Sequence, residues 1–140
     1  MTIFVDSDVI ISSLLSTTGA SYLLLQKKTT DAFYISSISK QELEQVCERL
    51  DIKKDKLDSL IRKNLQIIKI DKQIKGIKNK YGKYVYDIND AHIVAAAVDC
   101  HAGFIISYNI KDYKIEKIRN DLNIIVFKPS TFLQYTRSLR

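Results

Sequence analysis

The sequence has few residues that break or cross-link a chain: its 140 residues include 4 glycines, 1 proline, 2 cysteines and no tryptophan. So little glycine and proline argues against linkers and disordered segments. The two cysteines, Cys47 and Cys100, fit small apolar positions within predicted helices better than a disulfide or a metal site. We therefore expect one globular domain that spans residues 1–140.

Long hydrophobic runs are also missing from the sequence. No apolar stretch approaches the roughly 20 residues that a membrane-spanning helix needs. The N-terminus has no basic region ahead of an apolar one, which a secretory signal peptide would require. We therefore expect a cytoplasmic protein that does not contact a membrane.

Acidic residues are fewer than basic ones, with 16 Asp and Glu against 22 Lys and Arg, so the net charge is +6. A basic protein attracts phosphate backbones without regard to their sequence. The same excess of lysine, together with isoleucine and asparagine, also arises from an AT-rich genome. The charge therefore supports a nucleic-acid partner without establishing one.

Short apolar runs alternate with helical patterns along the whole chain. The pattern predicts a parallel sheet covered by helices on both faces, so the expected fold class is a three-layer α/β/α sandwich. The predicted strands are residues 2–5, 33–35, 65–70, 104–106 and 123–127. The predicted helices include residues 20–28, 39–50, 55–63, 91–98 and 115–121.

Three aspartates lie next to the most apolar of these elements. Asp6 ends the first predicted strand, Asp90 begins the apolar helix before the fourth strand, and Asp112 follows the fourth strand. A carboxylate at the end of a buried strand loses hydration unless a cation or hydrogen-bond donors meet it. Packing alone does not call for an acid at Asp90 or Asp112, so we interpret these positions as functional.

Two motifs contain the second and third of these aspartates. Residues 87–97 read D-x-x-D-x-x-I-x-A-A-A, and residues 105–113 read I-I-S-x-N-x-x-D-Y. Together they resemble the C-terminal motifs of PIN-domain nucleases, especially the VapC-like toxins. The strand that ends in Asp6, and Glu42 in the helix after the second strand, follow the family order. The resemblance implies a PIN-like, Rossmann-like sheet of about five strands in the order 3-2-1-4-5.

In a sheet of this order, ligands bind where the strand order reverses, which is between the first and fourth strands. The resemblance implies that Asp6, Asp90 and Asp112 bind a metal there and that Glu42 completes the catalytic set. Oxygen ligands without cysteine or histidine select Mg²⁺ or Mn²⁺. The expected reaction is hydrolysis of RNA phosphodiester bonds by an endoribonuclease.

Two alternatives compete with a catalytic role for Glu42. Ser39 could cap the helix with Glu42 three residues later, which is a capping box and needs no catalytic role. Glu44 lies two residues further on and would point to another face of the same helix. The sequence leaves open which glutamate faces the site.

Other polar residues are predicted to support the site. Ser107 and Asn109 would orient Asp6 or the metal, and Asp87 would cap the turn before Asp90. Many PIN nucleases have an aspartate at the position of Asn109, so one or two metal ions remain possible. Asp8 fits a helix cap, which Ser7 could also provide, as well as it fits the metal site.

A run of lysines just before this region suggests contacts with nucleic acid. On a helix, Lys72, Lys75 and Lys78 would share one face opposite Ile74 and Ile77. Such a stripe is more often a solvated face. We keep RNA binding as a secondary hypothesis for the set Lys72, Lys75, Lys78, Lys80 and Lys83.

Two rival functions fit parts of the pattern. The segment around Asp6 and Asp8 also matches the D-x-D start of haloacid-dehalogenase-like phosphatases, in which the first aspartate is a nucleophile and the second a general acid. A non-catalytic RNA- or protein-binding PIN module is the other alternative. If the chain is VapC-like, the resemblance further implies a homodimer and a cognate antitoxin protein.

Overall fold

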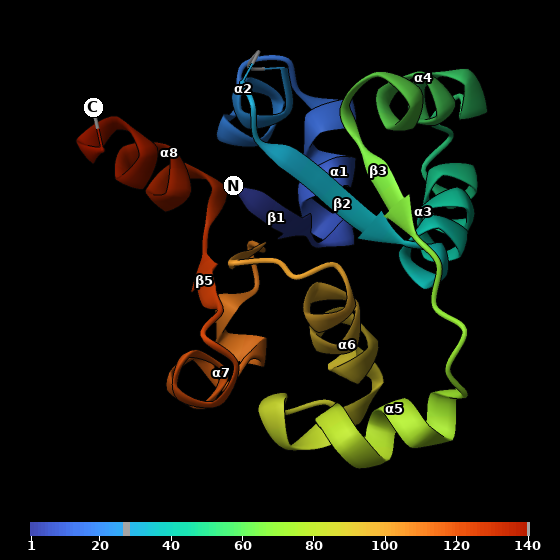
Figure 1. The fold of residues 1–140 in the computed structure, drawn as a ribbon. Coiled ribbons are helices and arrows are strands. Elements are labelled where there is room, and N and C mark those ends of the chain that lie inside the picture. The colour runs from blue at the N-terminus through green and yellow to red at the C-terminus, as the bar shows by residue number, and fades with distance from the viewer. Residues whose placement is uncertain (27–28, 140) are drawn as a thin grey trace.

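A five-stranded parallel sheet lies at the centre of the protein, and the structure, a computed structural model, describes residues 1–26 and 29–139 (Figure 1). The sheet order is β3-β2-β1-β4-β5, which confirms the predicted order. All four neighbouring strand pairs are parallel. The strands are β1 (Thr2–Val5), β2 (Ala32–Ser36), β3 (Gln66–Ile68), β4 (Phe104–Ile106) and β5 (Ile125–Phe127).

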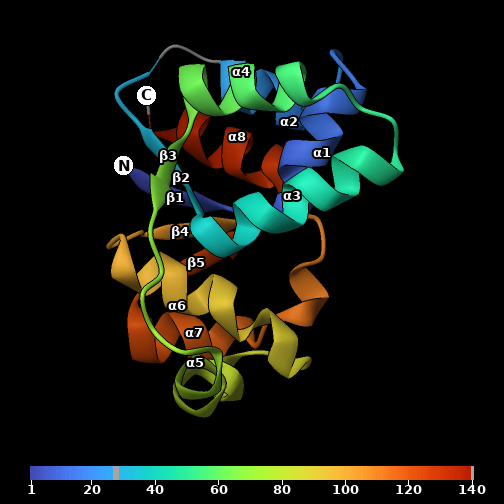
Figure 2. The same ribbon diagram turned by 90° about the vertical axis from the view of Figure 1, so that its right-hand side faces the viewer.

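Helices cover both faces of the sheet, as the fold class requires. Figure 2 shows α1–α4 and α8 on one side of the strands and α5–α7 on the other. Each side has its own cluster of buried apolar residues against the sheet. The helices are α1 (Ser7–Leu15), α2 (Ala20–Gln26), α3 (Ser37–Arg49), α4 (Lys54–Asn64), α5 (Ile74–Tyr81), α6 (Ala91–Asp99), α7 (Ile115–Leu122) and α8 (Pro129–Ser138).

The central strands β1 and β4 are the most deeply buried. Ile3, Phe4 and Val5 of β1 and all of β4 are buried, because helices cover both faces of these strands. The paired register Val5↔Ile106 brings the ends of β1 and β4 side by side. Residues that follow the two strands, 6 and 107, therefore lie next to each other at the point where the strand order reverses.

Helix α6 positions another part of this region. Residues 91–97 of α6 are all buried, and four of these seven are alanine. Small side chains let a helix lie close against its neighbours, and α6 packs between α5 and the sheet. Asp90, which directly precedes α6, lies near enough to Asp6 at the end of β1 for the two charges to interact.

Two helix starts differ from the predictions. Asp6, not Ser7 or Asp8, caps α1, since its Oδ1 accepts a hydrogen bond of 2.8 Å from the backbone N–H of Ser7. Ser36, not Ser39, caps α3, and its Oγ accepts a bond of 3.0 Å from the Ser39 N–H. The capping box with Glu42 was therefore a wrong prediction. The cap lies earlier in each case because the preceding strand ends directly at the helix.

Other differences concern lengths and exposure. β3 and β5 are shorter than predicted, and Asn123, predicted to begin the last strand, has a left-handed φ of 56° that ends α7. Leu23, in the apolar run of α2, is 49% exposed. Lys27 and Lys28, the predicted end of the second helix, lie outside the described residues.

The lysine stripe does not form the predicted helical face. α5 begins at Ile74, so Lys72 precedes the helix, and its Nζ lies 2.9 Å from Oδ1 of Asp99. Ile74 was predicted to face inward with Ile77, but only Ile77 is buried. The remaining lysines of the set keep their predicted RNA contacts as a hypothesis.

No helix among the described residues is long and apolar enough to cross a membrane by itself. Helices α1 and α2 meet the criterion of length and composition only as a pair, and they are bent by 97° relative to each other.

The central and edge strands should differ in their contribution to stability. Replacing the fully buried Ile105 of β4 by alanine should lower the free energy of unfolding by about 2–5 kcal/mol, because it leaves a cavity. Ile67→Ala on the edge strand β3, where the side chain is 42% exposed, should cost less than about 1 kcal/mol. Urea denaturation followed by circular dichroism measures both, and equal losses would contradict the assignment of β3 to the edge.

Candidate active site

Asp6 joins the ends of the two central strands. Its backbone N–H donates to the carbonyl of Ile106 over 2.9 Å, which continues the pairing of β1 with β4. Its Oδ2 accepts hydrogen bonds of 2.8 Å from the hydroxyls of both Ser107 and Tyr113. Donors therefore meet this partly buried carboxylate, as the argument from desolvation requires. The predicted support of Asp6 by Ser107 agrees with this contact.

Asp8 lies in the first turn of α1 and is held by the loop after β4. Its Oδ2 accepts bonds of 3.1 Å from the Tyr108 N–H and from Nδ2 of Asn109. Its Oδ1 is buried and has no hydrogen-bond partner among the described residues. Burial, followed by the charge of Asp6, raises the pKa of Asp8 to about 6. Asp8 is therefore part of the polar cluster beside Asp6 rather than the cap of α1.

Asp90 is surrounded by other acids. It precedes α6 and forms no side-chain capping bond there. Burial, followed by the charges of Asp6, Asp87 and Asp112, raises the pKa of Asp90 to about 6, whereas His92 acts in the opposite direction. These carboxylates come from segments far apart in sequence, yet they are near enough to repel one another. The structure thus brings Asp6, Asp90 and Asp112 to the same region.

Asp87 has the capping role that the sequence predicts. Its Oδ1 accepts a hydrogen bond of 3.0 Å from the N–H of Asn89, at the start of the short 3₁₀ turn Ile88–Asp90. This bond fixes the turn that delivers Asp90 to the start of α6.

Glu42 contacts the site through a histidine. Its Oε1 lies 3.1 Å from Nε2 of His92, which is buried in the first turn of α6. Glu44 instead lines a cavity with Cys47 and Glu48, on the other side of α3. Of the two glutamates, Glu42 is therefore the one that faces α6. Because α3 begins at Ser37, Glu42 lies in its second turn.

Only one of the two ring nitrogens of His92 has a partner within the described part of the chain. Its Nε2 contacts Glu42, but its Nδ1 is buried and has no hydrogen-bond partner among the residues that the structure describes.

Tyr113 is a site residue for which the sequence predicted no role. The side chain is buried, and its hydroxyl donates to Asp6. Burial and the neighbouring charge of Asp6 raise the pKa of Tyr113 well above its ordinary value of 10, so the hydroxyl keeps the proton that it donates. The tyrosine directly after Asp112 in the motif was the available signal, but nothing in the sequence linked it to Asp6.

The chemistry of the donors fits a hard divalent cation. Carboxylate oxygens are the ligands that Mg²⁺ and Mn²⁺ prefer, and a cation would offset both the burial and the neighbouring negative charges that raise the pKa of Asp90. Within residues 1–26 and 29–139, no three Asp, Glu, His or Cys side chains lie close enough to hold an ion as they stand.

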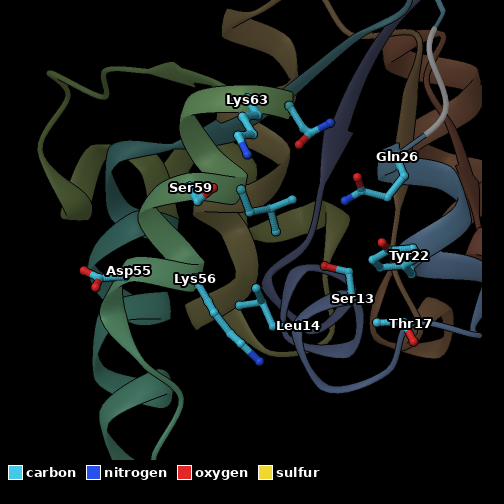
Figure 3. A pocket seen from close by; sticks show the side chains of 11 residues that line it. Ser13, Leu14, Thr17, Tyr22, Gln26, Asp55, Lys56, Ser59 and Lys63 are labelled. Carbon is cyan, nitrogen blue, oxygen red and sulfur yellow. The ribbon is translucent and has the colours of Figure 1, made fainter.

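A separate cavity of about 400 Å³ lies between α1, α2 and α4. Figure 3 shows Lys56, Ser59 and Lys63 of α4 on one side of it and Tyr22 and Gln26 of α2 on the other. None of the predicted carboxylates lines this cavity, so it is distinct from the cluster around Asp6.

A parallel sheet of this order, with acids gathered beyond β1 and β4, is the architecture of PIN domains. The family model for the PIN domain matches residues 2–111. The chain therefore belongs to the PIN domain family, as its motifs indicated. No curated protein gives a significant sequence match.

Solved structures with a similar fold include toxin-antitoxin proteins. The Klebsiella pneumoniae toxin-antitoxin complex aligns with a TM-score of 0.64 and 20% identity, covering 92% of this chain and 98% of that one. VapBC2 from Rickettsia felis, bound to a promoter DNA fragment, aligns with a TM-score of 0.63 and 19% identity, covering 90% of this chain and 97% of that one. VapC20 from Mycobacterium tuberculosis, a sarcin-ricin loop cleaving toxin, aligns with a TM-score of 0.53 and 13% identity, covering 74% of this chain and 86% of that one.

The raised pKa values predict how stability changes with pH in the metal-free protein. The pKa of Asp8 and Asp90 is about 6 when folded, against an ordinary value of 3.8, so the folded state keeps protons that the unfolded chain loses. Stability in EDTA should therefore fall as pH rises from about 4 to about 6 and then level off. Thermal unfolding over this range should show a shallower fall for Asp90→Asn.

Asp71→Asn is the matched control, because it also removes one carboxylate charge from a side chain that is 78% exposed. The control should keep the slope of the parent protein. A slope that is unchanged in Asp90→Asn would contradict a raised pKa of Asp90 in the folded state.

Proposed function

We propose that the protein is a divalent-metal-dependent endoribonuclease that acts in the cytoplasm. The observation that supports this most directly is the gathering of Asp6, Asp90 and Asp112 beyond β1 and β4 in a PIN fold. Acids that repel one another in one crevice are costly to the fold and are typical of functional sites. The net charge of +6 is consistent with an RNA substrate.

In this proposal Asp6, Asp90 and Asp112 hold Mg²⁺ or Mn²⁺. The bound ion would lower the pKa of water and stabilise charge on the phosphate. The hydroxyls of Ser107 and Tyr113 hold Oδ2 of Asp6, and the Ser7 N–H holds Oδ1. Oδ1 accepts one hydrogen bond, so it would keep a lone pair for a cation. Asn109 and Asp8 fix the loop after β4, from which Asp112 extends.

Glu42 is proposed to orient the attacking water with the help of His92. The contact of 3.1 Å between Oε1 of Glu42 and Nε2 of His92 fixes the glutamate relative to the start of α6. Asp90 lies two residues before His92, so this contact holds Glu42 close to one of the proposed metal ligands. This role rests on the family resemblance and on that contact.

We further propose that the protein is the toxin of a toxin-antitoxin pair. Three similar folds are the toxin-antitoxin complex from Klebsiella pneumoniae, VapBC2 from Rickettsia felis and the toxin VapC20. The partner would be a small antitoxin protein, and the toxin would form a homodimer.

The two alternative functions are less well supported. The chain belongs to the PIN domain family, and Asp8, the general acid of a dehalogenase-like phosphatase, is held by the loop after β4. A non-catalytic PIN module would have no need for a crevice of mutually repelling acids.

Metal removal and Asp6→Asn should both abolish RNA cleavage if the proposal is correct. The loss should exceed the roughly 10- to 100-fold typical of residues that only support metal ligands, whereas Asn109→Ala should fall within that range. Cleavage of total RNA, with EDTA and with Mg²⁺ or Mn²⁺ restored, measures this. Asp71→Asn, which removes a charge from an exposed side chain, should cleave like the parent.

Cleavage by Asp6→Asn at the rate of the parent would refute the enzyme proposal. Hydrolysis of p-nitrophenyl phosphate with an aspartyl-phosphate intermediate would favour the phosphatase instead. Binding of RNA without any cleavage, in the presence of either metal, would favour the non-catalytic module.

A further inference from the structure

A basic and aromatic cavity of about 600 Å³ lies beside the acidic cluster. Tyr113 belongs to both the cavity and the acidic cluster, because it lines the cavity and its hydroxyl donates to Asp6 over 2.8 Å. Three lysines line it, Lys111, Lys114 and Lys117, against Glu116 as the one acid among the described lining residues. The cavity is therefore a cationic surface one side chain away from Asp6.

Backbone pairing fixes the cavity to the segment that carries Asp112. Residues 84–86 run antiparallel to 112–114 through a bridge between Val85 and Tyr113. The N–H of Tyr86 donates to the carbonyl of Asp112 over 3.1 Å, and the N–H of Lys114 donates to the carbonyl of Tyr84 over 2.9 Å. This pairing sets the backbone of Tyr86 and Lys114 relative to Asp112.

Tyr86 has no role in the core. It is 72% exposed, whereas the neighbouring Tyr84 and Val85 are buried. Nζ of Lys114 lies 5.4 Å from the centre of the Tyr86 ring, which places a cation on an aromatic face. An exposed ring next to a cation offers both contacts that a single-stranded nucleic acid uses, base stacking and phosphate attraction.

The negative charge of the nearby acids gives a physical reason for a basic surface beside them. The acids around Asp90 attract a metal ion but repel the phosphates on either side of a bond to be cut. Cations close to the acids, yet separate from them, offset that repulsion. Lys111 is exposed and Lys114 is partly exposed, whereas Lys117 lies 3.3 Å from Asp121.

We propose that this cavity binds one nucleotide of single-stranded RNA next to the phosphodiester that faces the acids. The base stacks on Tyr86, and Lys111 and Lys114 contact the flanking phosphates. The inference rests on the proposed nuclease function and adds a substrate-binding subsite to it. Stacking accepts any base, so this subsite positions the strand and does not select its sequence.

The test measures binding rather than cleavage, by fluorescence anisotropy of a labelled single-stranded RNA of mixed sequence, in EDTA. Tyr86→Ala should weaken binding by about 5- to 100-fold, because one stacked base is lost. Tyr86→Phe keeps the ring and should bind within about twofold of the parent. Lys114→Gln should reduce the slope of log affinity against log salt by about 0.7, the value for one phosphate contact on a single strand.

Lys63→Gln is the matched control for charge, because this exposed lysine lines the cavity between α1, α2 and α4 instead. It should leave the salt slope unchanged. All variants should unfold at the temperature of the parent, since Tyr86 is largely exposed and lies outside the core.

The outcomes separate this inference from the nuclease proposal. Parental affinity in Tyr86→Ala, or no RNA binding by the parent, overturns the subsite. An equal loss in Tyr86→Ala and Tyr86→Phe overturns stacking, because the hydroxyl would then make the contact. If Tyr86→Ala loses binding but the parent cleaves no RNA with Mg²⁺ or Mn²⁺, the subsite stands and the nuclease proposal fails.

Discussion

The carboxylate of Asp6 is the point on which the rest of the site depends. It follows β1 directly, and it accepts hydrogen bonds from Ser107 and Tyr113, which lie 101 and 107 positions later in the chain. The parallel register of β1 and β4 makes these bonds possible, since it ends both strands at the same edge. Without that register, Asp6 would keep only the local N–H of Ser7 as a donor, and Asp112 would not lie near it.

The second constraint is charge. Burial, followed by the charges of Asp6, Asp87 and Asp112, raises the pKa of Asp90, so the fold holds an arrangement that opposes its own stability. The two central strands and the buried helix α6 fix the backbone at this place. Their packing offsets the free energy lost by holding the acids together. Next to the acids, the lysines around Tyr113 and Tyr86 provide a surface of opposite charge. The acids can attract a metal cation, and the neighbouring lysines can attract phosphates. Such a pair of surfaces suits a polyanionic substrate.

Local rules predicted much of the site and missed specific parts of it. Asp6, Asp90 and Asp112 stood out because acids border apolar elements, and the cap at Asp87 follows from turn chemistry. The capping box at Glu42 was wrong, although it obeyed a sound local rule, because β2 runs directly into α3 and Ser36 provides the cap. Choosing between Glu42 and Glu44 required knowing which face of α3 meets His92, and this depends on how two distant helices pack.

The sequence by itself determined the layered α/β class through the alternation of apolar strands and helices, and it marked the three aspartates. The strand order followed from a family resemblance and not from the pattern of apolar residues. Only the tertiary structure decided that Tyr113 donates to Asp6, that Asp8 is bound by the loop after β4, and that Tyr86 lies beside Lys114. The physical reason is that hydrogen bonds and ring contacts are short and directional. They depend on how segments far apart in the chain are placed, which periodicity along the chain does not record.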